Sequence, residues 1–564
     1  MAMPTDLEIA SAARLHPVEG IAAEMGIAPD HVEHHGREIA KISLAAIDQM
    51  GPPRAKYVLV TATNPTPLGE GKTTIAVGLA QAFKHIDRRA VVTLRQPSLG
   101  PTFGIKGGAA GGGYSQVVPM EEMNLHLTGD FHAVTAANNL ISALIDNQIY
   151  HGNQLSIGTG DVTWRRVLDV NDRTLRNVVT GLGGRTNGVP RETGFDITAA
   201  SEIMAMLGLA TSLRGLREML GRTVIGFDRH GRAVTAEEVK AAGSAAVLLK
   251  DALSPNLMQT LEGTPAIVHT GPFANIAHGS SSIVGDYVGM RGGDYLITEA
   301  GFGSDIGAEK FFNIKCRASG LAPDAAVVVT TVRSMKFHSG KYTIKVGRPL
   351  PTALFEENPG DVLEGTANLR QHIRIVRRHG VVPVVAINAF PTDFASEHEA
   401  IVAVCEEEGV RWAVAQPHAD GGPGMVDLAR AVEDAVAEGS NFQMLYPDDM
   451  PLRDKIETIA TDIYGADGVK FDAIAERQLA RYEDLGWGHL PICMAKTQYS
   501  LSHDASLLGA PTGWILRVRE VQAAIGAGFI LPLTGTITRM PGLGAHPSAH
   551  AMDIDDDGNV VGLS

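Results

Sequence analysis

Short runs of apolar residues, rich in valine and isoleucine, recur along most of the chain. They occupy residues 57–61, 90–94, 266–269, 295–298, 325–332, 381–387 and 491–494. Several of these runs are continuous rather than alternating with polar residues, which is typical of strands buried on both faces. Each run is therefore predicted to be a strand inside a covered sheet.

Segments with helical periodicity lie between these runs, at residues 134–149, 237–252, 361–379 and 425–437. Strands that alternate with helices are typical of βα units and of a mostly parallel sheet. We expect an α/β fold through most of the chain. The tail after Pro541 has little apolar periodicity and is predicted to be a surface strand or a frayed end.

A glycine-containing loop separates the first of these strands from a helix-like segment at residues 75–83. It reads Thr66, Pro67, Leu68, Gly69, Glu70, Gly71, Lys72 and Thr73. The pattern G-x-x-x-x-G-K-[ST] of phosphate loops fits except at Thr66, where the first glycine would stand. Such a loop points backbone N–H groups and the positive helix end at one place, which suits the phosphates of a nucleotide. We expect Lys72 to add a cation and the Thr73 hydroxyl to ligate Mg²⁺; a glycine turn that binds nothing is the alternative.

The composition favours a small-molecule enzyme. A chain of 564 residues is too long for one ordinary core, so two to four domains are expected. The 63 glycines and the 5% of aromatic residues favour α/β layers with tight loops over a β-sandwich. The formal charge of 48 − 63 = −15 repels nucleic acid and anionic membranes, so we expect neither as a partner.

The cysteines indicate a reducing compartment. Cys316, Cys405 and Cys493 are far apart and form no C-x-x-C pair, so neither a disulfide framework nor a thiolate zinc site is predicted. Residues 1–25 lack the basic and apolar regions of a secretory signal, and no apolar stretch approaches the ~20 residues that span a bilayer. We expect a soluble cytoplasmic protein.

Charged residues follow two further predicted strands. Arg95 comes directly after the strand at residues 90–94, at the edge where open α/β sheets bind ligands, and a guanidinium makes bidentate contacts with phosphate or carboxylate. Glu299 and Asp305 lie in a glycine-containing loop after the strand at 295–298, which is either a ligand loop or an ordinary turn. The glycine run at residues 107–113 is predicted to approach a ligand or a partner closely, with a flexible linker as the alternative.

Histidines form two groups of candidate ligands. His126, Asp130 and His132 are spaced so that they could share a metal, and His269 and His278 flank a Gly-Pro-Phe segment. Zinc needs three or four converging ligands, which spacing alone does not establish. Hydrogen-bonded structural histidines are the favoured interpretation.

Taken together, these segments resemble the formate–tetrahydrofolate ligases, also called 10-formyltetrahydrofolate synthetases, over nearly the whole chain. The segments that carry the resemblance are residues 66–73, 97–119, 124–130, 259–265, 271–279, 299–312, 463–468 and 493–500. The resemblance implies a P-loop NTPase-like core with a mostly parallel sheet and further α/β domains. It also implies a homotetramer, Mg²⁺ bound with ATP, and activation by a monovalent cation, K⁺ or NH₄⁺.

The chemistry implied by the resemblance has two steps. Formate attacks the γ-phosphate of ATP to give formyl phosphate, and N10 of tetrahydrofolate then displaces phosphate. Lys72 and Arg95 are the expected catalytic residues, because the first step brings two anions together. The mixed anhydride hydrolyses easily, so the loops are expected to exclude water.

The resemblance also assigns binding residues outside the phosphate loop. In this family the pterin stacks between aromatic side chains, and Phe390 matches one of them, with Phe302 as a further folate contact. The second aromatic residue is usually a tryptophan, and His418 stands in its place here. The stretch from Ser500 onward, including Ser502 and Pro511, is expected near the adenine.

Three parts of the chain are expected, with approximate boundaries. Residues 1–130 hold the phosphate loop, residues 131–360 complete the large domain with an inserted subdomain, and residues 361–564 carry the pterin and adenine loops. Two alternatives to the ligase are kept. One is a nucleotide-switched carrier or assembly ATPase, and the other is the same ligation on a modified pterin, suggested by His418.

Overall fold

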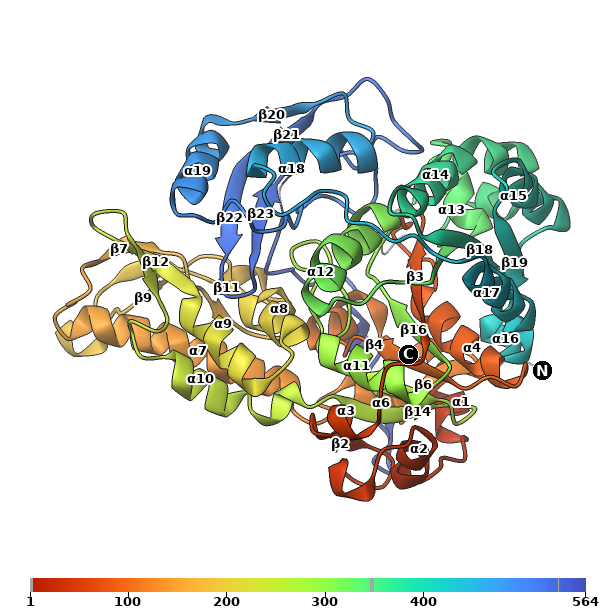
Figure 1. Ribbon diagram of the computed structural model, residues 1–564, viewed down its shortest axis with the longest axis horizontal. Helices are drawn as coiled ribbons and strands as arrows, with labels where there is room; N and C mark the ends of the chain where they lie inside the picture. Colours follow the sequence, from red (N-terminus) through yellow and green to blue (C-terminus); the bar gives the residue numbers. More distant parts are fainter. Residues whose placement is uncertain (1–3, 345–348, 536, 564) are drawn as a thin grey trace.

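A mixed sheet of twelve strands forms the centre of the molecule (Figure 1). The computed structural model describes residues 4–344, 349–535 and 537–563. The strand order is β1-β2-β14-β15-β4-β16-β3-β17-β18-β19, and all neighbours from β15 to β19 are parallel. The bounds are β1 Val32–His34, β2 Ala40–Ile42, β14 Asn256–Thr260, β15 Pro265–Val268, β4 Ala90–Leu94, β16 Tyr295–Glu299, β3 Lys56–Ala62, β17 Ala325–Thr330, β18 Val382–Asn388, β19 Arg411–Ala415, and β5 Gly111–Gly112 with β6 Ser115–Val118 off this path. The expectation of an α/β fold with a mostly parallel sheet is confirmed.

Helices cover both faces of this sheet, which is why its strands are continuously apolar. In β3 the side chains of Tyr57 and Leu59 join one buried cluster, and those of Val58 and Val60 join the cluster on the other face. The first cluster is closed by α11 Ile283–Gly292, α13 Val332–His338, α14 Pro359–Arg378 and α15 Ala395–Glu407. The second is closed by α4 Lys72–Lys84 and α17 Val426–Glu438. The two-sided burial excludes solvent from every central strand and fixes their register.

Two further lobes flank the sheet (Figure 1). One contains α7 Asp130–Tyr150, α8 Glu202–Leu209, α9 Leu213–Arg222, α10 Ala242–Leu248, β7 Ile157–Val162, β12 Val224–Asp228 and β13 Ala233–Thr235. The other contains α18 Leu452–Thr458, α19 Ala473–Asp484, β20 Val469–Phe471, β21 Leu516–Val518, β22 Glu520–Ala524 and β23 Phe529–Leu533. Phe529 and Leu531 of β23 pack into the core of the first lobe, so the two lobes share a buried boundary. The three-part division at residues 130 and 360 stays a prediction.

Two predicted elements differ from the structure. Residues 491–494 form isolated bridges beside β23 rather than a strand, because Pro491 and the facing Pro532 have no N–H for a ladder. The helix expected at 237–252 begins only at Ala242, because Lys240 adopts a left-handed conformation with φ 58°. The end of the run at 325–332 caps α13, where the Thr331 side chain accepts a hydrogen bond from Ser334 N.

The tail forms a small surface hairpin, β24 Asp553–Ile554 with β25 Val560–Val561, within the described residues. This agrees with the surface strand predicted there. Among the described residues, no helix combines the length and the apolar character needed to cross a membrane.

Candidate functional site

The phosphate-loop segment joins the carboxyl end of β3 to the first residue of α4, which is Lys72. Gly71 precedes the helix in a left-handed conformation with φ 73°. A Cβ on Gly71 would lie 2.5 Å from Nδ2 of Asn388, so both the conformation and the space require glycine. No side chain caps the first turn of α4, so its N–H groups are left for a ligand.

Glu70 holds this loop from inside the protein. Its carboxylate accepts hydrogen bonds from Thr66 N (2.7 Å) and from the Thr331 hydroxyl, and its carbonyl oxygen accepts one from Asn388 Nδ2 (3.1 Å). Burial raises the pKa of this carboxyl, which these hydrogen bonds oppose. Glu70, predicted as an ATP-binding residue, therefore ties the loop to the carboxyl ends of β17 and β18.

Three polar side chains meet at the carboxyl ends of β3, β4 and β16, which are neighbours in the sheet. Thr73 Oγ1 donates a hydrogen bond to Glu299 Oε2 (2.8 Å), and Arg95 Nη2 lies 3.6 Å from Glu299 Oε1. Arg95 Nη1 also donates to the carbonyl oxygen of Pro272 (3.3 Å). The position predicted for Arg95, at the edge beside the phosphate loop, is confirmed. Glu299 is only 5% exposed and links Arg95 to Thr73.

Cations are concentrated at this edge. Burial lowers the pKa of Lys72 to about 8, and the nearby charges of Lys106 and Arg95 lower it further while Glu299 and Glu70 oppose the change. Burial is also the main reason why the pKa of Lys106 is lowered. Positive groups that destabilise one another in this way are stabilised by a bound polyanion. The arrangement suits phosphate chemistry.

Asn64, in the loop after β3, is held by two neutral histidines that sequence reasoning missed. His338 Nε2 lies 2.9 Å from Asn64 O, and His372 Nε2 lies 3.1 Å from Asn64 Oδ1. Gly509 N donates to Nδ1 of His338, which is consistent with Nε2–H on that ring. His372 accepts from Ser304 N at Nδ1, and its Nε2 also faces Asn64 N (3.0 Å). Burial lowers the pKa of each histidine to about 4. Both rings therefore act as neutral supports of the loop.

These two histidines make the folded protein sensitive to acid. The unfolded chain takes up a proton on each histidine near pH 6.5, whereas the folded protein does so only near pH 4. More protons are bound by the unfolded state in this window, so the free energy of unfolding is expected to fall as pH decreases from about 6.5 to 4. Denaturant titrations across this range measure the effect. The slope should be smaller in His372→Gln and unchanged in His489→Gln, whose histidine is exposed; equal slopes in both variants would contradict the assignment.

A buried ion pair continues the same cluster. Lys496 Nζ lies 2.7 Å from Asp305 Oδ2, both side chains have no exposed surface, and Asn64 Nδ2 donates to Asp305 Oδ1 (3.1 Å). Asn64 Nδ2 also donates to the carbonyl oxygen of Gln498 (3.2 Å). The loop after β16 and the segment from Lys496 onward thus meet at the phosphate loop. For Asp305 the structure favours this supporting role over an isolated turn.

The segment predicted near the adenine begins beside this cluster. Ser502 is buried, where its Oγ lies 3.0 Å from Ser500 Oγ and donates to Asp504 O (3.0 Å). Pro511 O accepts a hydrogen bond from Trp514 Nε1 (3.0 Å). Whether this segment contacts adenine stays a prediction.

The predicted folate residues lie on three separate loops. Phe302, after β16, is a non-glycine residue with φ 64°. Phe390, after β18, is covered by the Arg333 guanidinium, whose central carbon lies 4.2 Å from the ring centroid. His418, in α16 Pro417–Asp420, has Nε2 3.5 Å from Asp6 Oδ1, which raises the pKa of the imidazole.

The glycine run lies against the backbone beside His418. Tyr114 N donates to His418 O (3.0 Å), and a Cβ on Gly113 would lie only 1.9 Å from that oxygen. Gly113 therefore approaches the chain's own α16 closely, and the approach to a ligand or a partner predicted for residues 107–113 stays a prediction. The linker interpretation is not supported.

Two of the remaining candidate ligands, Asp130 and His269, have structural partners, whereas His126 and His132 are exposed. Asp130 lies 2.8 Å from Lys41 Nζ and accepts a hydrogen bond from Asn256 Nδ2 (2.8 Å) in the interior. His269 contacts Ser282 Oγ (2.6 Å) and Ala252 O (2.7 Å) through its two ring nitrogens. Within the part of the chain that the structure describes, no group of three or more His, Cys, Asp or Glu residues is placed to hold a metal ion.

Arg333 is a further site residue that the sequence reasoning missed. It is the second residue of α13, just past the carboxyl end of β17, and its charge opposes the rise that burial causes in the pKa of Glu70. The signal was the one that identified Arg95, a cation directly after a buried strand. It was hidden because the apolar run continues through Val332.

Comparisons with known proteins agree over the whole chain. Residues 4–564 match the family model described as formate–tetrahydrofolate ligase. A formate–tetrahydrofolate ligase of Saccharopolyspora erythraea is 60% identical over 565 residues, covering 100% of both chains. Formate–tetrahydrofolate ligase 3 of Rubrobacter xylanophilus is 60% identical over 572 residues, and a formate–tetrahydrofolate ligase of Roseiflexus sp. (strain RS-1) is 57% identical over 564, again with 100% of both chains covered.

Proposed function

The chain belongs to the formate–tetrahydrofolate ligase family, and on this premise we propose that it joins formate to tetrahydrofolate with ATP, giving 10-formyltetrahydrofolate, ADP and phosphate. The observation that carries the proposal is the cluster of Lys72, Arg95, Thr73 and Glu299 at the carboxyl ends of three neighbouring strands. We extend the confirmed α/β architecture to a P-loop NTPase-like core, because the strand, the loop and the helix that begins at Lys72 occur in the required order.

Oxygen ligands for Mg²⁺ stand beside the loop. The Thr73 hydroxyl and the Glu299 carboxylate lie 2.8 Å apart, and hard oxygen atoms of this kind fit a magnesium ion that also binds phosphates. Thr73 would hold the ion, with Glu299 at its side. When bound, the ion would neutralise charge on the transferred phosphoryl group.

In the first step, the protein must bring two anions together. Lys72 lies at the start of α4, where the uncapped N–H groups also point, so the ammonium and the helix end would both stabilise the phosphates of ATP. Arg95 presents a planar guanidinium from the end of β4, which β16 separates from β3. This group suits the formate carboxylate or the equatorial oxygens of the phosphoryl group. The product of this step is formyl phosphate.

In the second step, N10 of tetrahydrofolate attacks the formyl carbon. Arg95 would orient the carbonyl and phosphate oxygens from the carboxyl end of β4, where Pro272 O and Glu299 hold its guanidinium. We expect the loops around Asn64, Gly301 and Gly509 to exclude water, because a mixed anhydride hydrolyses readily.

The folate is proposed to bind against Phe390 and Phe302, with His418 at the place usual for a tryptophan. Arg333 covers the Phe390 ring, so the pterin must displace its guanidinium or lie beside it. The ion pair of His418 with Asp6 holds the imidazole near the glycine run.

Replacement of His418 by tryptophan tests this folate site. His418→Trp is expected to lower the apparent KM for tetrahydrofolate, because an indole stacks more area on the pterin than an imidazole does. Initial rates at varied tetrahydrofolate measure it. His489→Trp, which changes an exposed histidine of another lobe, serves as the control. An unchanged or higher constant in His418→Trp would show that His418 does not face the pterin.

A homotetramer, activation by K⁺ or NH₄⁺ and a cytoplasmic location complete the proposal. The first two rest on the family resemblance. The location rests on Cys316, Cys405 and Cys493, which are all buried and unpaired. The carrier ATPase and the modified pterin acceptor are not favoured, since the family match covers residues 4–564.

The decisive experiment is a ligation assay with each substrate omitted in turn. ADP and 10-formyltetrahydrofolate should form together when ATP, Mg²⁺, formate and tetrahydrofolate are all present. ADP release that needs neither formate nor tetrahydrofolate would overturn the proposal.

A further inference from the structure

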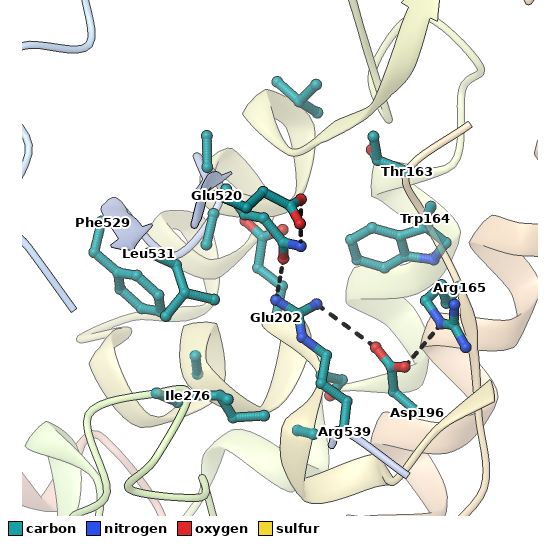
Figure 2. Close-up of a pocket in the computed structure, with 18 of the residues that line it drawn as sticks. Thr163, Trp164, Arg165, Asp196, Glu202, Ile276, Glu520, Phe529, Leu531 and Arg539 are labelled. Carbon is teal, nitrogen blue, oxygen red and sulfur yellow. Dashed lines mark hydrogen bonds and ion pairs between the residues drawn. The ribbon is translucent and has the colours of Figure 1, made fainter. Parts of the chain in front are cut away.

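A cavity of about 340 Å³ lies where the two outer lobes meet, away from the phosphate loop (Figure 2). Its walls come from the first lobe, from β22 and β23, and from the loop that carries Ile276 and Ala277. None of Lys72, Arg95, Thr73 and Glu299 lines it. The volume is at the small end of the range for sites that bind small molecules. The ligase chemistry therefore leaves this cavity without a role.

A chain of polar side chains crosses the cavity, as the dashed lines in Figure 2 show. Gln522 Nε2 donates to Glu520 Oε1 (3.0 Å), and Arg539 donates to the Oε1 atom of Gln522. Arg539 Nη1 lies 3.6 Å from Asp196 Oδ2, and Arg165 Nε lies 2.8 Å from Asp196 Oδ1. The two arginines and the Gln522 amide thus direct their donors at protein acceptors.

Two carboxylates keep acceptor capacity for a ligand. Glu202 Oε1 accepts from Ala527 N (3.1 Å), and Glu520 Oε1 accepts from Gln522. A backbone hydrogen bond from Gly526 also reaches Glu202. A carboxylate can accept about four hydrogen bonds, so both of these side chains, which line the cavity, keep acceptor capacity. Burial raises the pKa of Glu202 to about 7. Both carboxylates are partly buried. A carboxylate that is shielded from water without a full set of donors is costly, so a ligand that brings N–H groups would be stabilised here.

Aromatic side chains provide flat surfaces on the walls. Trp164 is 6% exposed, and its indole N–H donates to Asn138 O (3.1 Å), which fixes the plane of the ring. In the view of Figure 2, Trp164 lies on one side of the cavity and Phe529 with Leu531 on the other. Fixed aromatic faces favour a planar ring, which stacks at little cost in conformational entropy.

We propose that this cavity binds a planar heteroaromatic ring whose edge carries an N–H group next to an amino group, directed at Glu520 and Glu202. Guanine nucleosides and pterins share this 2-aminopyrimidinone edge. The two adjacent donors face the two carboxylates, and the ring stacks on Trp164. A phosphate is not required, since the arginines of the cavity already serve Asp196 and Gln522.

Calorimetric titration of the intact chain tests the site. Guanosine should bind, and inosine, which lacks the amino group, should bind about tenfold more weakly because one charged hydrogen bond is lost. Glu520→Gln should weaken guanosine about tenfold while ligation continues, since Glu520 lies outside the ligase site. Glu218→Gln, on the exposed face of α9, is the matched control and should bind like the unaltered protein.

Two further measurements distinguish a pterin from a guanine nucleoside as the ligand, and the cavity from the ligase site as the place of binding. 6-Hydroxymethylpterin that binds more tightly than guanosine, and is weakened by Glu520→Gln, supports the cavity and identifies a pterin as its ligand. Guanosine displaced by saturating ATP or tetrahydrofolate would place the binding in the ligase site instead. The proposal is overturned by that result, by equal affinities for guanosine and inosine, by unchanged affinity in Glu520→Gln, or by no binding at about 1 mM ligand, the weak end of specific affinities.

Discussion

Lys72→Ala is expected to reduce ligation by about 10² to 10³-fold in kcat while the protein stays folded. Lys72 starts α4 at the point where the loop, the helix end and Glu299 converge, so its ammonium is the cation nearest to the expected phosphates. Its removal leaves the developing phosphoryl charge with Arg95 alone among the assigned catalytic groups. Single-turnover measurement of ADP and 10-formyltetrahydrofolate separates this loss from a loss of ATP binding.

The control for Lys72 is a lysine at the amino end of β3, the strand that precedes the phosphate loop. Lys56, the first residue of β3, is half exposed and lies 3.2 Å from Asp324, so Lys56→Ala should ligate normally. Lys72→Arg keeps the charge and should retain part of the activity. Normal turnover by Lys72→Ala would remove this lysine from the mechanism.

The lowered pKa of Lys72 gives the same assignment a second test. With a pKa of about 8, the side chain is charged below that pH and loses its charge above it. The value of kcat/KM for ATP, which reports on the free enzyme, should therefore fall as pH rises through about 8. Lys72→Arg should lack this alkaline limb, because a guanidinium stays charged. An unchanged limb in Lys72→Arg would assign the titration to another group.

The sequence predicted those parts of the fold and site that depend on local order along the chain. β3, the loop and α4 follow one another without interruption, and Arg95 directly follows β4, so periodicity and the rule for parallel sheets were enough. Glu299 follows the same rule. The covering of the two faces also agrees with the continuous apolar runs, although these runs mark only six of the twelve strands, β3, β4, β15, β16, β17 and β18.

The parts that were missed depend on contacts between distant residues. Asn64 meets His338, 274 residues later, and His372, 308 residues later, and no local pattern marks such a pair. The supporting role of Asp305 likewise required Lys496 from another segment. The prediction of a strand at residues 491–494 was wrong for a related reason. Their apolar character reflects burial beside β23 and not a continuous ladder of hydrogen bonds. Burial is readable in a sequence, whereas the partner that causes it is not.

Neither the sequence nor the structure determines whether His418 contacts the pterin. The sequence identified it as the departure from the family pattern, and the structure adds that Asp6 lies beside it. An imidazole paired with a carboxylate presents a smaller and more polar surface than an indole. The apparent KM for tetrahydrofolate measured in His418→Trp therefore shows whether the histidine reduces stacking on the pterin.

Arg95→Ala is expected to cause a loss at least as large as that of Lys72→Ala, because Arg95 is proposed to act in both steps. Its guanidinium faces Glu299 and Pro272 O across the carboxyl edge of β4, where formate and the transferred phosphoryl group must meet. Without it, the formate carboxylate loses its bidentate partner and the carbonyl oxygen of formyl phosphate loses a donor. Positional isotope exchange in ATP measures the first step alone, and formyl transfer from synthetic formyl phosphate to tetrahydrofolate measures the second.

β4 itself supplies the control for Arg95. Arg89 precedes this strand at its amino end, is 57% exposed and pairs with Asp294, so Arg89→Ala should be fully active. Arg95→Lys keeps a charge but loses the planar fork, and it should recover less activity in formyl transfer than in isotope exchange, because the second step needs two oxygens oriented at once. Equal recovery in the two assays would show that charge alone suffices. Normal rates for Arg95→Ala in both assays would exclude Arg95 from the mechanism, and the anions would then be bound by Lys72 and the amino end of α4 alone.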